Sequence, residues 1–442
     1  MSAPLPGLNG HRRPPTVPPL LGGDRKLTVR AHAGGRDSAT PTLPPPTSYS
    51  PPNLGSDGWP SASQRSEPED FPGSERPANS DDPPWAIGID VGGTKIAAGL
   101  VALSSGRLLA QRLVPTGVTR GGVAVLADSI ALVEELAGEA RSLGGVSVGV
   151  GIAVAEIVDP RGEIRSNHSI GWEGLSPRPA FAHIAPVVVE ADVRAAALGE
   201  ARYGAGRPFG RWLYVSIGTG ISACLVRDGH PDPGARGGAL VLSSGPLTFP
   251  CAACGEARPF VLEEYAAGPA LAARYAAATG LPIAGAEAVT AAAARGDERA
   301  AEVLRTAATA LGSAIGWAVN LLDPEAIVVG GGLGLAGGLY GETLMAATRV
   351  HIWHPAARDL PILPAWLGTT AGVVGAAVAA SGPFDSGTRW LGGAGERRRA
   401  SMEFQAAERD GVLVGVRSGG EYAGPDRRPP DQLQERRGNE PR

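Results

Sequence analysis

The chain has 442 residues, of which 19% are charged and only 5% are aromatic. This length is sufficient for two or three compact units with terminal tails. The 40 Lys and Arg residues are balanced by 44 Asp and Glu residues, for a formal net charge of -4. Such a chain has no global positive field with which to hold nucleic acid or an anionic membrane. We therefore exclude a protein whose function is to bind polyanions without specificity.

The cysteine count and the start of the chain bear on localisation. Only 3 cysteines are present, which argues against a disulfide scaffold and for a reducing compartment. The first residues lack the apolar segment of a signal peptide, and no apolar run reaches the length of about 18 residues that a spanning helix needs. We expect a soluble, cytoplasmic protein without a membrane partner.

Both ends of the chain differ in composition from its middle. Of the 40 prolines, 18 lie in residues 1–84, where apolar periodicity is missing. Such a segment buries too little apolar surface to offset its ordering entropy, so 1–84 are predicted to form a disordered Pro-rich arm. The folded part is expected over 85–382. Residues 383–442, with Arg397–Arg399 and a brief apolar patch at 412–416, are predicted to form a charged, mobile tail.

The first half of the folded part begins with strands. Residues 86–101 predict two strands joined by a tight Gly-Gly turn, and 107–115 predict a third antiparallel strand. Apolar residues recur at helical spacing over 123–143. Residues 146–154 form a largely apolar run of the kind found in buried strands.

A similar set of elements follows in the second half. The pattern predicts a strand at 187–190, a helix at 195–203 and a hairpin of 212–218 with 222–227. Residues 262–322 read as mostly helical with an interruption near 280–284, and 326–329 as a buried strand. Two similar units in one chain indicate a two-lobed α/β protein with a ligand cleft between the lobes.

The turn of the first hairpin carries the motif DVGGTK, from Asp90 to Lys95. Gly92 and Gly93 allow backbone N–H groups to approach a phosphate, while Thr94 adds a hydroxyl donor and Lys95 a positive charge. Asp90, at the end of a buried strand, is suited to holding Mg²⁺ or one of its waters. The same six residues are also compatible with an ordinary Gly-Gly hairpin turn.

Two further glycine turns follow. Gly218, Thr219 and Gly220 lie between two predicted strands, and Gly330–Gly332 follow a buried strand. Each of these turns alone is a weak signal. In this order, three turns from both lobes indicate that they hold one nucleotide.

With these motifs, residues 85–382 resemble the ROK family of sugar kinases and repressors, within the actin-like ATPase superfamily. The resemblance extends through Gly171–Trp172, 190–200, 262–268 and 323–332. It implies a two-lobed, ribonuclease H-like fold that uses ATP and Mg²⁺, with Asp90 near the metal ion and Gly331 and Gly332 on the adenosine side. It also implies a homodimer.

We place the N-terminal lobe at 85–191, with the phosphate-binding hairpin, and the C-terminal lobe at 192–382. The last helix is expected to pack back on the N-terminal lobe.

The resemblance also gives the general base. Residues 190–194, followed by Ala195–Glu200, are similar to the family's catalytic segment, and Asp192 falls on the carboxylate that takes the proton from the attacking hydroxyl. Such a residue positions the nucleophile and accepts its proton late. The alternative is that Asp192 only caps a helix starting at about Val193.

The sugar-binding positions depart from the family pattern. Ala191 and Arg194 replace two Asn residues, and 237–241 lack the acidic residue and the histidine of the corresponding stretch. Glu263 keeps the family's carboxylate. Because buried polar groups select for the hydroxyls that pair with them, these replacements predict a different acceptor.

Several other residues are candidates to contact that acceptor and to select it. Glu156, where the family usually has Gly, and Arg194 are either ligand-reading residues or solvated surface residues. Asn167 and His168 lie where the family has a loop Asn that contacts sugar. Trp172 is expected to pack rather than to stack on a ligand.

A structural zinc ion, held by one His and three Cys in many family members, is not expected. Only Cys251 and Cys254 of that set remain, where four ligands are required. Cys224, in an apolar strand, is expected to be a small core residue.

The predicted function is ATP-dependent phosphorylation of a hydroxyl on a small-molecule sugar or sugar-like polyol: an unusual hexose, an amino sugar or a cyclitol. The alternative is a non-catalytic sensor of a sugar or metabolite on the same fold. A DNA-binding regulator is disfavoured, because the prolines of 1–84 exclude a helix-turn-helix there.

Overall fold

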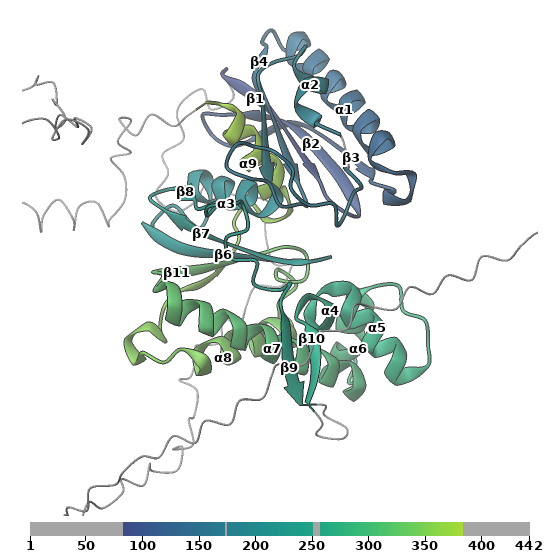
Figure 1. Ribbon diagram of the computed structural model, residues 1–442, viewed down its shortest axis with the longest axis vertical. Helices are drawn as coiled ribbons and strands as arrows, with labels where there is room; N and C mark the ends of the chain where they lie inside the picture. The colour runs from purple at the N-terminus through teal and green to yellow at the C-terminus, as the bar shows by residue number, and fades with distance from the viewer. Residues whose placement is uncertain (1–82, 173–174, 251–256, 383–442) are drawn as a thin grey trace, which may run out of the picture. The chain divides into compact units, whose positions relative to one another are not determined.

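The computed structural model describes residues 83–382, apart from 173–174 and 251–256 (Figure 1). The predicted arm at 1–84 therefore lies almost entirely outside the described residues. The predicted tail at 383–442 and the two cysteines Cys251 and Cys254 lie outside them as well.

The first sheet has five strands in the order β3-β2-β1-β4-β5. The first three strands form an antiparallel meander, and the last two run parallel to β1. The strands are β1 (Trp85–Val91), β2 (Lys95–Ala102), β3 (Leu108–Pro115), β4 (Ser147–Val154) and β5 (Val187–Ala191). A short 3₁₀ turn (Val118–Arg120) and helix α1 (Gly122–Ser142) connect β3 to β4, and α2 (Pro177–Phe181) precedes β5.

The second sheet repeats this topology in the order β8-β7-β6-β11-β12. Again three antiparallel strands are followed by two that run parallel to the first. The strands are β6 (Arg211–Ile217), β7 (Ile221–Arg227), β8 (His230–Pro231), β11 (Ala326–Gly330) and β12 (Ile362–Pro364). The repeated pattern explains why the sequence contains two similar sets of elements.

Helices and one hairpin complete the described part of the chain. The hairpin is β9 (Pro246–Pro250) with β10 (Ala257–Val261). The helices are α3 (Asp192–Tyr203), α4 (Glu263–Ala266), α5 (Gly268–Thr279), α6 (Ala286–Ala294), α7 (Glu298–Leu322), α8 (Gly338–His351) and α9 (Ala371–Ala380), with 3₁₀ turns at Pro355–Ala357 and Gly368–Thr370.

The two faces of β1 serve different helices. Ile87, Ile89 and Val91 point into the core that α1 closes. Alternate residues of a strand face opposite sides, and the other side of β1 packs against α9. Asp90 is on that side, where it lies against Gly372 at the start of α9. The strand period therefore directs the Asp90 carboxylate away from the α1 core and toward α9.

Helix α9 lies unusually close to the first sheet and to α3. A Cβ atom at Gly88 or Gly151 would overlap the backbone of α9, and one at Gly375 would overlap the carbonyl of Ala195 in α3. Only glycine permits such a close approach of two backbones. Helix α9 packs on β1, β2, β4 and β5 as well as on α3. Since α3 itself contacts both sheets, the lobe boundaries at 191 and 192 stay a prediction.

The second sheet also has two distinct faces. Leu213, Val215 and Ile217 of β6 face the largest core, which α7 and α8 share, whereas Trp212 and Tyr214 face α3. Helices α3 and α9, which pack on each other, therefore cover one face of each sheet.

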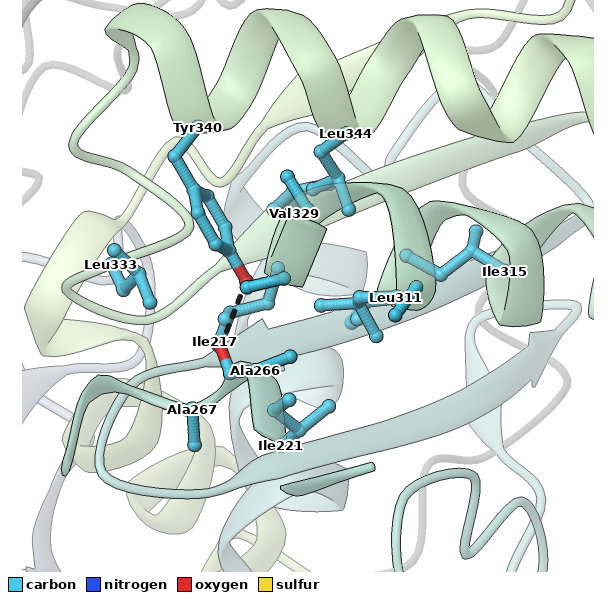
Figure 2. Packing of buried hydrophobic residues seen from close by; sticks show 14 of the residues in the cluster. Ile217, Ile221, Ala266, Ala267, Leu311, Ile315, Val329, Leu333, Tyr340 and Leu344 are labelled. Carbon is cyan, nitrogen blue, oxygen red and sulfur yellow. Dashed lines mark hydrogen bonds between the residues drawn. The ribbon is translucent and has the colours of Figure 1, made fainter. Parts of the chain in front are cut away.

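The largest core also supports the loops that follow the strands of the second sheet. In Figure 2, Ile217 and Ile221, on either side of the second glycine turn, lie in the same cluster as Leu333. The hydroxyl of Tyr340 on α8 donates to the carbonyl of Ala266, 3.0 Å away. The core thus holds the segments next to two glycine turns in a fixed relation.

The two-sheet α/β architecture confirms the predicted fold class. The predicted strands and helices agree with the structure to within one to three residues, apart from the division of 262–322 into four helices. Helices α2 and α8, strand β8, the β9–β10 hairpin and β12 were not predicted. Strand β12 has only three residues and ends at Pro364, so it gives no periodic signal. Within the described residues, no helix has the length and apolar character needed to cross a membrane.

The close packing of α9 leads to a stability prediction. We expect Gly151→Ala to lower the free energy of unfolding by about 2 kcal/mol or more, because the added methyl group forces the backbones of α9 and β4 apart. Urea unfolding measures the change. Gly245→Ala is the matched control, because a Cβ there has no neighbour within 4 Å. Equal stability of the two variants would contradict the close packing.

Candidate active site

Hydrogen bonds within the protein fix the shape of the first glycine turn, at 92–95. The N–H of Gly92 donates to the carbonyl of Lys95 (3.1 Å), and the hydroxyl of Thr116 donates to the carbonyl of Gly92 (2.6 Å). The N–H of Thr116 also donates to the carbonyl of Thr94 (3.0 Å). Thr116 is buried, whereas Thr94 and Lys95 are exposed. The turn is therefore held in shape while its outer groups stay open to a ligand.

Hydrogen bonds fix the second glycine turn, at 218–220, in the same way. The N–H of Gly218 donates to the carbonyl of Gly220, and the carbonyl of Gly218 accepts from Gly268, both at 2.9 Å. The buried hydroxyl of Ser243 donates to the carbonyl of Ile221. The Glu263 carboxylate accepts from the N–H of Ile221 (2.7 Å). Glu263 is thus fixed against the second turn.

The three turns converge. The hydroxyls of Thr94 and Thr219 are 3.2 Å apart, so the first two turns touch across 125 positions of sequence. After the third turn, the N–H groups of Leu333 and Gly334 both donate to the carbonyl of Ile217 (3.0 Å). Gly331 has a φ of 78° and lies directly against Ile217, so a side chain is excluded there. The structure brings together all three predicted nucleotide turns.

Two carboxylates lie beside these turns. Asp90 is near the end of β1 and Asp192 directly follows β5, and both strands pair with β4 in parallel. Burial raises the pKa of Asp90 to about 7, and the nearby Asp192 adds to the shift while Lys95 opposes it. Burial also raises the pKa of Asp192 to about 6, against the opposing effects of the Val193 N–H and of Arg194. Nearby positive charge is therefore insufficient to offset the burial of both groups.

Asp192 is the first residue of α3, and one of its carboxylate oxygens accepts from the N–H of Val193 (2.6 Å). A capping side chain precedes the helix and accepts from its second or third N–H group. The N-cap residue here is Ala191, which makes no such bond. The bond from Val193 differs from a usual capping bond, and a purely helix-capping role for Asp192 stays an alternative to the predicted base.

Glu156 and Arg194, which the sequence leaves as either ligand-reading or solvated surface residues, are both buried, so neither is a solvated surface residue. The guanidinium of Arg194 donates to Glu190 (2.6 Å) and to the carbonyls of Gly237 (3.0 Å) and Val158 (2.6 Å). These bonds connect the segment after β4 with the segment after β8. They favour a structural role for Arg194, and ligand reading by this residue stays a prediction.

Glu156 follows β4 and accepts hydrogen bonds from the loop at 166–170. Asn167 and His168, on the same loop, are exposed. Trp172, just beyond it, is buried in the core of the first sheet, as expected. The loop thus presents its two candidate acceptor-reading side chains to solvent.

Sequence reasoning missed Glu200, whose carboxylate is fully buried. It accepts from the N–H groups of Ala205 (2.8 Å), Trp366 (3.0 Å) and Leu367 (2.7 Å). These bonds tie the end of α3 to the segment that leads into α9. The signals in the sequence are its place at the end of the family-like segment Ala195–Glu200 and an acidic residue on the Ala-rich face of α3, and neither assigned it a role.

The carboxylates near the turns suit magnesium, which phosphates and water also ligate, better than a metal ion that only protein side chains hold. Among the described residues, no group of three or more His, Cys, Asp or Glu side chains is arranged to hold a metal ion. Magnesium usually takes one or two carboxylates together with phosphates and water, and the half-buried Asp90 matches that requirement. Cys224 is buried in β7 as expected, and burial raises its pKa to about 12.

Comparison with known proteins identifies the family. The model of the ROK family matches residues 86–382. The chain belongs to the ROK family. A glucokinase of Streptomyces coelicolor is 32% identical over 327 residues, which cover 67% of this chain and 98% of the glucokinase. An N-acetylmannosamine kinase of Escherichia fergusonii is 29% identical over 305 residues, with 67% and 98% covered.

A solved structure supports the fold. The crystal structure of a ROK family glucokinase from Streptomyces griseus in complex with glucose and AMPPNP has a TM-score of 0.58 and 29% identity. The match covers 67% of this chain and 99% of that one. The predicted two-lobed, actin-like ATPase fold is therefore confirmed.

The buried Glu200 generates a prediction on pH and stability. Burial raises its pKa from 4.5 to about 7, so the folded state binds a proton more tightly than the unfolded state does. The stability that protonated Glu200 contributes is present below pH 4.5 and is lost as the pH rises through 7. Wild type should therefore lose stability relative to Glu200→Gln between pH 5 and pH 8, as measured by urea unfolding. Parallel profiles of the two proteins would show that Glu200 does not titrate in this range.

Proposed function

We propose that this protein is an ATP-dependent kinase that phosphorylates a hydroxyl group of a sugar or sugar-like polyol. The observation that carries the proposal is the contact between Thr94 and Thr219, which joins two glycine turns, together with the half-buried Asp192, whose charge acts on Asp90 near the first turn. The kinase names of the similar proteins and the nucleotide analogue in the Streptomyces griseus structure support it.

The glycine turns provide the groups that a triphosphate needs. The backbone N–H group of Gly93, the hydroxyl of Thr94 and the ammonium of Lys95 would bind phosphate oxygens from one side, while Gly92, whose N–H is paired with the carbonyl of Lys95, would shape the turn. Gly218, Thr219 and Gly220 would bind them from the other, and Gly331 and Gly332 would border the adenosine. Asp90 would hold Mg²⁺ or its waters. Magnesium, when bound, neutralises charge on the phosphates during transfer.

Asp192 would act on the acceptor hydroxyl. Its hydrogen bond to Val193 fixes one carboxylate oxygen, which leaves the other for the hydroxyl. A pKa of about 6 makes Asp192 more basic than an ordinary aspartate and still mostly ionised at pH 7. It therefore orients the hydroxyl toward the phosphate and accepts the proton late in the transfer.

The acceptor class follows from the groups around Asp192. Glu263, Asn167 and His168 remain as polar candidates to contact it, while Ala191 and the 237–241 segment lack the polar side chains of the family pattern. We infer an acceptor other than ordinary glucose: an unusual hexose, an amino sugar or a cyclitol. Use in the cytoplasm and assembly as a homodimer stay predictions from the sequence.

The first test removes the proposed base. Asp192→Asn should lower acceptor-dependent ADP release from Mg-ATP by about 10³-fold or more, because an amide cannot take the proton. ATP binding, measured by calorimetry, should be unchanged. The acceptor panel comprises aldohexoses, N-acetylhexosamines and cyclitols. Asp359→Asn, at an exposed position without a described contact, is the matched control.

Three outcomes of this test differ in meaning. Turnover by wild type and by Asp359→Asn, but not by Asp192→Asn, supports both the kinase and its base. Parental turnover by Asp192→Asn would show that another group is the base. Absence of turnover by wild type with ATP binding intact would favour the non-catalytic sensor.

The pKa of Asp192 predicts a pH profile for the wild-type enzyme. The base must be ionised to act, so kcat/KM should fall about tenfold per pH unit as the pH drops below about 6. Initial rates between pH 4.5 and 8.5 at constant ionic strength measure this limb. A profile that stays flat down to pH 4.5 would contradict the raised pKa.

A further inference from the structure

The carboxylate of Glu156 is surrounded by donors. The side chain is only 7% exposed, and one oxygen accepts from the Ser166 hydroxyl and from the N–H of His168 (2.9 Å). The other oxygen accepts from the N–H groups of Ser169 (2.7 Å) and Ile170 (3.2 Å). Four donors from one short loop therefore converge on a single buried anion.

This arrangement is an anion-binding nest filled by the protein's own side chain. Three successive N–H groups, from His168 to Ile170, point at one centre of negative charge. Such concave runs of backbone donors bind anions in many proteins. Hydrogen bonds to a charged acceptor are about twice as strong as neutral ones, so the carboxylate is a strong constraint on the loop.

The remaining bonds of the loop fix it to the end of β4. The N–H of Ile157 donates to the Ser166 hydroxyl oxygen (2.8 Å), and the N–H of Arg165 donates to the carbonyl of Ile157 (2.7 Å). A single β-bridge joins Val158 to Ile164. Residues 156–170 are therefore one closed hairpin whose far end returns to Glu156.

The hairpin is also fixed to the catalytic elements. The N–H of Ala155 donates to the carbonyl of Val91 at the end of β1 (3.3 Å). Arg194, two residues after Asp192, donates to the carbonyl of Val158. The loop that Glu156 holds is thus positioned relative to both Asp90 and Asp192.

We propose that Glu156 is a positioning residue for the acceptor: its carboxylate holds the loop at 166–170 so that Asn167 and His168 face an acceptor hydroxyl poised at Asp192. The inference rests on the proposed kinase function. It assigns Glu156 to acceptor binding and not to ATP binding, because within the described part of the chain its carboxylate bonds to the loop at 166–170 and not to a glycine turn.

The charge of Glu156 has a second effect. The groups that act on Asp192 are Glu156 and Glu263, which raise its pKa, and Arg194, which lowers it. Asp90 is also close enough for the two aspartates to interact. Removing the charge of Glu156 while these other groups remain should move the acidic limb of the rate profile to lower pH.

The test compares three substitutions in the full chain. Glu156→Gln keeps the shape but places an NH₂ group against N–H donors, and Glu156→Ala empties the nest. Each should raise the acceptor KM by roughly tenfold or more, with the KM for ATP unchanged. Glu156→Asp retains the charge and should restore part of the affinity. Glu163→Gln, an exposed glutamate in the same hairpin, is the matched control and should behave as wild type.

Chemical rescue separates positioning from a general loss of structure. Formate added to Glu156→Ala should occupy the nest and lower the acceptor KM in a saturable way, whereas Glu156→Gln should not respond. On the acidic side of the profile, kcat/KM of Glu156→Gln should also begin to fall at a lower pH than that of wild type. An unchanged acceptor KM in both Glu156→Ala and Glu156→Gln would overturn the inference, as would an equal rise in the KM for ATP.

Hydrogen exchange distinguishes this inference from the proposed function. The amides of His168, Ser169 and Ile170 should lose protection in Glu156→Ala and keep it in Glu163→Gln. Unchanged protection would overturn the inference whether or not turnover is observed. If wild type phosphorylates no acceptor, the kinase proposal and the positioning role fail together, and lost protection would then assign Glu156 to loop structure alone.

Discussion

The close contact of α9 with β1, β4 and α3 is the constraint on which the site depends. Asp90 lies on the α9 face of β1, and Asp192 begins the helix that packs on α9. A helix normally lies about 8–10 Å from the axis of a neighbouring helix, and small residues shorten that distance. The glycines at 88, 151 and 375 therefore determine how near the two carboxylates approach each other.

The same closeness puts carboxylates where their charge is disfavoured. Asp90, Asp192 and Glu200 all have raised pKa values because burial disfavours their charged forms. Two of the three are at the proposed reaction centre, and the third ties α3 to the segment before α9. Carboxylates with raised pKa values are common at sites that bind a cation or a substrate. Ligand binding should therefore stabilise this fold more than its contact area alone would indicate.

Local patterns in the sequence predicted the strands, the long helices and the three turns, because glycine and apolar periodicity act over a few residues. They did not predict the groups that hold the turns. Thr116 and Ser243 reach the turns from other parts of the chain, and Glu200 binds amides more than 160 residues away. Nothing within a local window distinguishes such a Thr, Ser or Glu from an ordinary surface residue. Contacts of long sequence separation therefore set the limit of what could be predicted.

The residues that depart from the family pattern also show the limit of prediction from sequence. The sequence identified Glu156 and Arg194 as unusual, but it did not indicate which way their side chains point. In the structure both are buried, and each bonds to backbone groups of a neighbouring loop. If their role is to position loops, a new residue in a binding site need not touch the ligand to change which ligand is accepted. Discrimination among acceptors then falls to Asn167, His168 and Glu263, whose placement depends on the loops that these buried charges hold.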